Sequence, residues 1–204
     1  MILDIHSHRP APYPQGIVCL DNFEVPLLEG QLYSAGIHPW NTSEAPSEET
    51  FNRLEALAND SRIAAIGECG VDLMKGGPLF RQLQILKRQI ELSEKVGKPL
   101  ILHCVKGADI ILGLKRDLNP SQPWIIHGFR GNPRLARQLS DKGLYLSFGE
   151  KFNADTVAEM PAERILAETD ESILTIEEII GRLSTASNRD ILSSVAANIQ
   201  TLKL

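Results

Sequence analysis

The feature that most constrains this chain is an alternation of short apolar runs with amphipathic segments. Eight runs are rich in apolar and β-branched residues, and each is long enough for a strand: ILDIHSH, GIVCLD, QLYSAGIHP, RIAAIGECGVD, PLILHCV, WIIHGF, LYLSFGE and RILAETD. Strands that alternate with helices over short connections form βαβ units, whose strands are parallel and whose crossovers are right-handed. The pattern therefore predicts an α/β fold, a (β/α)8 TIM-type barrel.

The expected helices carry start and stop signals. Ser47 can cap a helix in SEETFNRLEALAND, and LFRQLQILKRQIELSEKV repeats apolar residues at helical spacing before Gly97 and Pro99. Asn132 is the expected N-cap of NPRLARQLSDKG, which Gly143 ends, and ADIILGLKRDL fits a further helix. Strand and helix are thus expected to alternate through the middle of the chain.

Other connections lack room for a helix. RPAPYPQ and NFEVPLLEG are short and proline-rich, and MPAE limits the seventh crossover. We therefore expect several shortened or missing crossover helices and one thinly covered side of the barrel. A second copy of the chain can cover that side, which makes a homo-oligomer an expectation. An open, doubly wound sheet is the competing architecture.

Composition limits the class of protein. A chain of 204 residues is near the lower end for such a barrel, so we expect one domain over residues 1–204. With 43% hydrophobic and 23% charged residues, it can bury a sizeable core. The net charge of -5 gives no general attraction to nucleic acid or anionic membranes, so contacts with phosphate must be local. No apolar run approaches the roughly 18 residues of a membrane-spanning helix.

Cysteine usage points to a reducing compartment. Cys19, Cys69 and Cys104 are odd in number and lack CxxC spacing, so they do not form a disulfide framework. No charged-then-apolar leader is recognisable at the beginning of the sequence. We therefore expect a cytoplasmic protein.

The five histidines all fall at the carboxyl ends of predicted strands: His6, His8, His38, His103 and His127. In a parallel barrel that end is the functional face, because side chains from different strands converge there. His6 and His8 are two apart on one strand and so point to the same side, which Asp4 shares. Taken singly, each histidine also fits a hydrogen-bonded position in the core.

Two carboxylates occupy similar positions. Glu68 follows small apolar residues and is flanked by glycines, where a carboxylate is costly unless it is paired or bound to metal. Asp170, in ILAETDES, can bind an ion or accept a proton from water. The alternatives are that Glu68 caps the following loop and that Asp170 is the N-cap of the final helix.

Together these residues predict a metal site. Four imidazoles and two carboxylates suit one or two divalent ions, such as Zn, Mg or Mn, and Glu68 is placed to bridge two of them. Structural zinc is disfavoured because no cysteine cluster accompanies the histidines. The predicted ligands are His6, His8, Glu68, His103, His127 and Asp170.

Six motifs in this order, DIHSH, AGIHPW, AIGECGVD, LILHC, IIHGFRG and LAETDE, resemble the TatD family of metal-dependent hydrolases and deoxyribonucleases. The resemblance extends from Asp4 to Asp170. It implies a (β/α)8 barrel, the six metal ligands named above, and catalytic roles for Asp170, near the attacking water, and for His38, which contacts substrate. The sequence departs from the family at Lys106, where an arginine is usual, and near Arg130, where a serine is usual.

The resemblance implies a phosphodiesterase or deoxyribonuclease that acts on DNA ends, including single-stranded ends, or on small nucleotides by metal-activated water. Arg9, Lys75, Lys106 and Arg130 each follow a motif closely and can form a basic rim that binds a phosphate-containing substrate. An ordinary charged loop surface explains them equally. Two other functions stay open: hydrolysis of an amide or lactone in a small molecule, and metal binding without catalysis.

Overall fold

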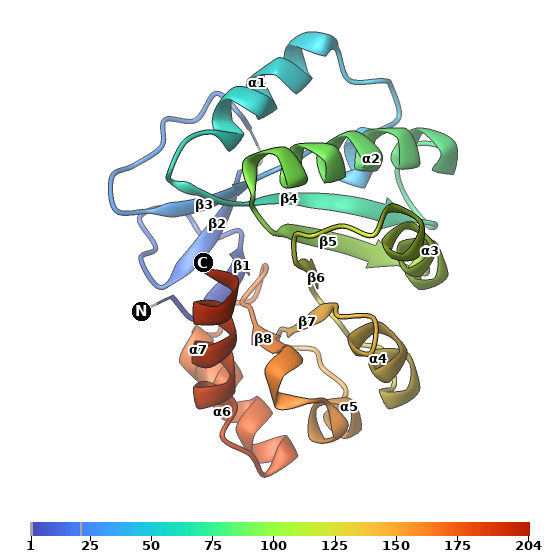
Figure 1. Cartoon of the computed structure of the whole chain (residues 1–204). Coiled ribbons are helices and arrows are strands. Elements are labelled where there is room, and N and C mark those ends of the chain that lie inside the picture. Colours follow the sequence, from blue (N-terminus) through green and yellow to red (C-terminus); the bar gives the residue numbers. More distant parts are fainter. Residues whose placement is uncertain (1, 21) are drawn as a thin grey trace.

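The structure contains eight parallel strands that follow one another around a single sheet in chain order (Figure 1). It is a computed structural model that describes residues 2–20 and 22–204. The strands are β1 (Asp4–Ser7), β2 (Gly16–Leu20), β3 (Leu32–Ala35), β4 (Ile63–Asp72), β5 (Leu100–Val105), β6 (Trp124–Ile126), β7 (Tyr145–Phe148) and β8 (Ile165–Ala167).

Main-chain hydrogen bonds join the first strand to the segment after the last. Ser7 and Asp170 form a parallel bridge. The amide of His8 donates to the carbonyl oxygen of Asp170 at 3.1 Å, and the amide of Asp170 donates to the carbonyl oxygen of His6 at 2.9 Å. The sheet is therefore a nearly closed TIM-type barrel, as predicted. The open, doubly wound alternative is wrong, because the strand order is sequential and the two outer strands meet.

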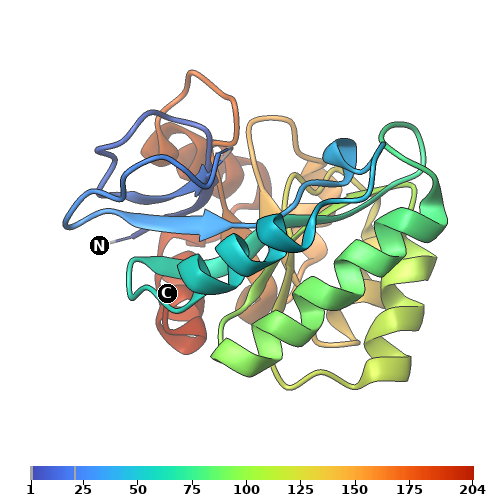
Figure 2. The ribbon, with the colours of Figure 1, turned by 90° about the horizontal axis from the view of Figure 1, so that it is seen from above.

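Helices cover the outside of the barrel from β3 onward. In Figures 1 and 2, α1 and α2 lie along the outer side of β4. The helices are η1 (Pro39–Asn41), α1 (Glu48–Ala58), α2 (Leu79–Val96), α3 (Ala108–Leu118), α4 (Pro133–Ser140), α5 (Ala154–Glu159), η2 (Ala162–Arg164), α6 (Ile176–Ser187) and α7 (Ile191–Leu202).

The predicted helix signals act at most of the expected positions. The side chain of Ser47 accepts a hydrogen bond from the amide of Thr50 at the start of α1, and Gly97 ends α2 in the left-handed conformation. Asn132 caps α4. This helix ends at Ser140, before the expected Gly143, because a turn separates it from β7.

Within the described residues, the first two crossovers contain no helix, as predicted, and α5 in the seventh has only 6 residues. Irregular segments replace the missing helices: Tyr13, Phe23 and Leu27 pack against the buried cluster on the outer side of β2 and β3. Val25 and Leu28 are 49% and 41% exposed on the same segments. The thin side is therefore largely covered by the chain itself, and its burial by a second copy stays a prediction.

Among residues 2–20 and 22–204, no helix is both long and apolar enough to cross a membrane.

Candidate metal centre

The predicted metal ligands all lie at the carboxyl end of the barrel. Side chains at this end converge because the parallel strands point the same way. His6 lies in β1, Glu68 in β4 and His103 in β5, while the remaining three follow β1, β6 and β8 directly or within a few residues: His8, His127 and Asp170.

Glycines bring Glu68 close to the neighbouring strand. Gly67 and Gly70 have φ values of +149° and +141°. A Cβ atom at Gly70 would lie 2.0 Å from the carbonyl oxygen of His103, and one at Gly67 would lie 2.5 Å from that of Ile101. Only glycine fits both positions, because any side chain there would overlap the backbone of β5.

The carboxylate of Glu68 is the centre of the site, and only 5% of the residue is exposed. Its Oε1 atom lies 2.7 Å from Nδ1 of His103, 2.7 Å from Nε2 of His127 and 2.9 Å from Nε2 of His38. Three imidazole nitrogens thus converge on one carboxylate oxygen.

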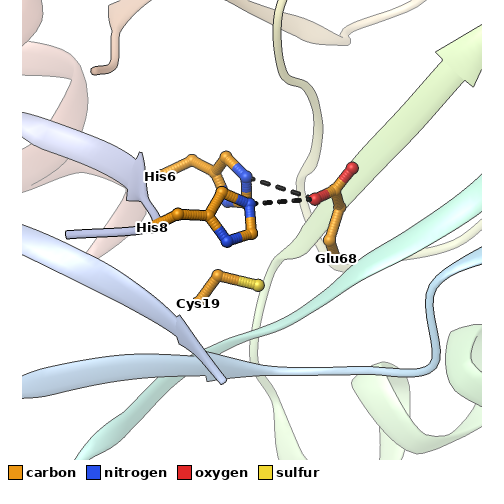
Figure 3. Close-up of side chains that lie close together, drawn as sticks. All are labelled: His6, His8, Cys19 and Glu68. Atoms are coloured by element: carbon orange, nitrogen blue, oxygen red, sulfur yellow. Dashed lines mark ion pairs between the residues drawn. The ribbon is translucent and has the colours of Figure 1, made fainter. Parts of the chain in front are cut away.

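The other oxygen of Glu68 faces the histidine pair of β1. Its Oε2 atom lies 3.2 Å from Nε2 of His6 and 3.7 Å from Nε2 of His8 (Figure 3). Oδ1 of Asp170 lies 3.9 Å and 3.8 Å from the same two nitrogens. The two carboxylates therefore lie near the same pair of histidines, and all six predicted ligands come together.

Electrostatics keep Glu68 ionised. Burial raises the pKa of its carboxyl group, but the charge of His127 and hydrogen bonds from neighbouring histidines outweigh burial and hold the pKa well below its usual range. Burial lowers the pKa of His127, and the charges of Glu68 and Glu168 more than reverse this and raise it well above its ordinary value. Burial and the charge of Glu168 raise the pKa of Asp170.

The hydrogen-bonding pattern at His103 fits a bound cation. Oδ2 of Asp72 lies 3.1 Å from Nε2 of His103 and also accepts a hydrogen bond from the indole of Trp40 at 2.7 Å. If the proton of a neutral His103 lies on Nε2, its Nδ1 lone pair faces the ionised oxygen of Glu68. A cation or an additional proton is needed to make that contact favourable.

Buried ring nitrogens without hydrogen bonds also indicate a bound cation. His6 is fully buried, and neither of its ring nitrogens has a hydrogen-bond partner. Nδ1 of His127 also lacks a hydrogen bond, but it lies 3.4 Å from Oε1 of Glu168, on the side of the ring away from Glu68. Buried polar atoms are rarely left in this state, and an ion bound at Nε2 of His6, the nitrogen that faces Glu68, would satisfy one of them. Three groups of side chains have ligand atoms within 4.8 Å of one another: His6, His8, Cys19 and Glu68; His6, His127 and Asp170; His38, Glu68 and His103.

His38 has a different hydrogen-bonding pattern from the other histidines. It is the N-cap of η1, and its Nδ1 accepts the amide proton of Trp40 at 3.1 Å. In a neutral ring the proton then lies on Nε2, which faces Glu68. His38 therefore presents an N–H donor to the site. This arrangement fits a substrate contact better than a metal ligand.

The alternative reading of Asp170 is wrong. The final two helices have other N-caps: Thr175 forms a capping box at α6, and Asp190 caps α7. Asp170 instead has a φ of 52° at the point where the barrel closes.

Three residues of the site were not singled out from the sequence. Asp72 orients His103, and the fully buried Glu168 lies 3.4 Å from Nδ1 of His127 and accepts the amide proton of Gly128 at 2.6 Å. Cys19 joins the group around His6. The sequence held a signal for two of them, because side chains two or four residues apart on a strand point to the same side. Asp72 is four residues after Glu68, and Glu168 is two before Asp170.

A cavity of about 890 Å³ opens above the histidines. Lys106 and Arg130 line it, so two of the four predicted rim cations reach the site. Lys75 lies over the ring of Trp40, 3.2 Å from its centroid, and Trp40 also lines the cavity. Arg9 is not among the lining residues, because its guanidinium donates to carbonyl groups of the loop after β8, at Ser172 and Leu174.

Comparison with known families gives a match over most of the chain. The model of the family described as TatD related DNase matches residues 28–199. A relative from Cronobacter sakazakii named 3'-5' ssDNA/RNA exonuclease TatD is 29% identical in an alignment 177 residues long, which covers 78% of this chain and 64% of that protein. A Bacillus subtilis protein named uncharacterized metal-dependent hydrolase YabD is 30% identical in an alignment 182 residues long, which covers 84% of this chain and 70% of that protein.

Solved structures share the architecture. The crystal structure of YjjV, a TatD homologue from Escherichia coli, superposes with a TM-score of 0.84 at 19% sequence identity and covers 99% of this chain and 97% of that chain. A TatD-family hydrolase from Entamoeba histolytica gives a TM-score of 0.72 at 19% identity, with 84% and 74% covered. These likenesses establish the barrel fold. The chain spans just under two thirds of the length of the Cronobacter relative.

Proposed function

Because the chain belongs to the TatD-related DNase family, we propose that it is a divalent-metal-dependent hydrolase that cleaves phosphodiester bonds at the ends of single-stranded nucleic acid. The observation that carries this proposal is the convergence of four histidines on the buried carboxylate of Glu68, with Asp170 beside two of them, His6 and His8. Such a donor set suits one or two ions of the Zn, Mg or Mn type.

We assign the metal-binding role to His6, His8, Glu68, His103, His127 and Asp170, as the sequence predicted. A divalent ion, when bound there, supplies Lewis acidity to the phosphoryl group and makes a nearby water easier to deprotonate. Glu68 contributes a negative charge that five histidine side chains surround. Asp72 and Glu168 hold the rings of His103 and His127 from behind.

Asp170 is the proposed general base. Its side chain is partly exposed to the cavity, and its pKa is raised by burial and by the charge of Glu168. A carboxylate at this position can accept a proton from a water molecule that a bound ion has made more acidic. In this role Asp170 would take a proton from the attacking water.

Stabilisation of the phosphate falls to the donors around the cavity. His38 directs its Nε2–H at Glu68 and is assigned a substrate contact for the state in which that carboxylate holds an ion, while Lys106 and Arg130 offer positive charge at the cavity wall. These groups attract phosphate locally in a chain whose net charge is -5. The predicted contact between Arg9 and substrate has the weakest basis in the structure, because the guanidinium of Arg9 donates to the carbonyl oxygen of Ser172 in the loop after β8.

Trp40 favours a single-stranded substrate. It is 42% exposed at the cavity, and Lys75 lies over its ring. An exposed aromatic ring beside cationic side chains is a stacking surface for an unpaired base whose phosphate follows into the site. Duplex bases are already stacked and cannot use such a surface without fraying.

The test is nucleotide release from labelled single-stranded DNA and RNA in the presence of Mg, Mn or Zn. We expect release in the wild type and a loss of at least about a hundredfold in Glu68→Gln, the scale of removing one electrostatic contact from an active site. Glu91→Gln, at an exposed position on α2, is the matched control and should keep full activity.

Two results would contradict the proposal. Turnover confined to neutral esters, amides or lactones would replace phosphodiester hydrolysis with the chemistry of a small-molecule hydrolase. Stoichiometric metal binding without turnover of any of these substrates would identify a non-catalytic metal-binding protein.

A further inference from the structure

Cys19 lies at the carboxyl end of β2 and faces the inside of the barrel. Side chains alternate along a strand. Val18 and Leu20 belong to the outer cluster that packs beneath α1, so Cys19 between them points the opposite way. It is 8% exposed and lines the cavity above the histidines.

The pairing of the first two strands brings this thiol to the histidine pair. Ser7 on β1 pairs with Val18 on β2, which places Cys19 beside His8. The Sγ atom of Cys19, a nitrogen of each of His6 and His8, and a carboxylate oxygen of Glu68 all lie within 4.8 Å of one another. Figure 3 shows Cys19 beneath the imidazoles of His6 and His8, with its sulfur on the side of Glu68.

A second observation points to a ligand at this position. His6 is 0% exposed, and neither ring nitrogen has a hydrogen-bond partner, although Nε2 lies 3.2 Å from Oε2 of Glu68. A buried imidazole without a partner is costly. An ion bound between these side chains would satisfy Nε2 of His6 and would lie within reach of the sulfur.

We propose that Cys19 is an additional metal ligand, bound through its sulfur to the ion held by His6 and His8. The inference depends on the metal site proposed above and specifies its selectivity. On binding, the thiol loses its proton to solvent and the sulfur donates an electron pair to the ion. A sulfur donor beside imidazoles favours Zn over Mg and Mn, which prefer oxygen.

The other two cysteines have different surroundings. Cys69 donates its S–H to the carbonyl oxygen of Ile101 at 3.7 Å and is fully buried in the core. Cys104 lines the same cavity as Cys19 but belongs to none of the groups whose ligand atoms converge among the described residues. Cys104→Ser is therefore the matched control for Cys19→Ser.

The decisive measurement is the absorption spectrum of the cobalt(II)-substituted protein, since a cobalt–thiolate bond gives an intense charge-transfer band in the near ultraviolet. We expect the band in the wild type and in Cys104→Ser, and its loss in Cys19→Ser. Metal analysis of each sample establishes that cobalt is bound, and circular dichroism establishes that each variant is folded.

The outcomes separate failure of this inference from failure of the metal site. Bound cobalt without a charge-transfer band in the wild type, or a band that persists in Cys19→Ser, would overturn the role of Cys19 alone. Absence of bound cobalt from all folded samples would overturn the metal site and this inference with it.

Metal competition supplies a second readout. Cys19→Ser should weaken Zn binding by at least about tenfold, the lower end of what loss of an outer-shell partner costs a metal site. Mn binding should change little, and Cys19→Asp, which supplies an oxygen ligand, should shift the preference from Zn toward Mn. Equal weakening of Zn and Mn binding in Cys19→Ser would contradict a ligand role and indicate packing alone.

Discussion

Asp72 orients two rings at once. Its Oδ2 atom accepts the indole proton of Trp40 and lies 3.1 Å from Nε2 of His103. Replacing Asp72 with Asn removes the charge that fixes the His103 tautomer, so we expect Zn affinity to fall by about 10–100-fold. Competition with a chromophoric chelator measures this. The control is Asp109→Asn, at an exposed position of α3, and equal affinity in both variants would contradict the role of Asp72.

Trp40 can be tested apart from this hydrogen bond. If its exposed ring stacks on an unpaired base, Trp40→Ala should weaken binding of single-stranded DNA by about 1–3 kcal/mol, the usual contribution of one base–aromatic stack. Trp40→Phe keeps a ring but also loses the hydrogen bond to Asp72. It should retain most of the affinity in a fluorescence titration, and a loss equal to that of Trp40→Ala would assign the effect to Asp72.

The site residues differ in how far the sequence could reveal them. His103 and His127 are conspicuous because each follows an apolar run at a strand end. Cys19 occupies an equivalent place, but its role depends on the pairing between β1 and β2, which no local pattern encodes. Glu168 is hidden in the same way, since its partner His127 is brought close only by the pairing of β6, β7 and β8.

Within elements, the conformation of β4 is set by its glycines. Gly70→Ala places a Cβ atom 2.0 Å from the carbonyl oxygen of His103 at a φ of +141°. We expect it to destabilise the protein by more than the roughly 1–3 kcal/mol that such backbone strain alone costs. Gly181 lies in the middle of α6, and a Cβ atom added there would meet nothing within 4 Å apart from its own helix backbone. Gly181→Ala should therefore stabilise the protein by about 0.5–1 kcal/mol. Urea unfolding compares the two, and similar effects would contradict this account.

The loop before β6 is tied to α2 by Glu94, whose carboxylate accepts hydrogen bonds from Ser121 and Gln122. Burial raises the pKa of Glu94, but these bonds outweigh burial and lower it from 4.5. A depressed folded-state pKa stabilises the protein above pH 4.5, and this contribution is lost as the pH falls through the folded value.

Glu94→Gln should therefore be less stable than the wild type by about 1 kcal/mol at neutral pH. The difference should shrink in acid, because the wild-type carboxyl group is then protonated. Unfolding curves across the pH range measure this, and a difference that is constant with pH would exclude the carboxylate as its source.

The elements themselves were largely predictable. All eight strands follow from apolar runs, and the starts of α1 and α4 follow from Ser47 and Asn132. The packing of Phe23 and Leu27 over the outer side of β2 and β3 did not follow. Those residues lie in a segment without periodicity, and what they cover is decided by tertiary contacts rather than by local sequence.

At the scale of the whole molecule, a bound ion should stabilise the barrel. At a free Zn concentration about 100 times Kd, linkage contributes about 2.7 kcal/mol, which raises Tm by roughly 5–11 °C for a protein of this size. A chelator should reverse the shift. Glu68→Gln should show little of it, and an equal shift in that variant would place the stabilising ion elsewhere.

The junction between His6, His8 and Asp170 joins residues from opposite ends of the barrel sequence. The side chains of the same residues face one another, so an ion bound by them would link β1 to the segment after β8, where the barrel closes. Amide hydrogens of β1 should then exchange with deuterium more slowly in the metal-loaded protein, while those of α3, which contains none of the proposed ligands, change little. Binding of the ion that serves the reaction would in that case also hold the first and last strands of the barrel together.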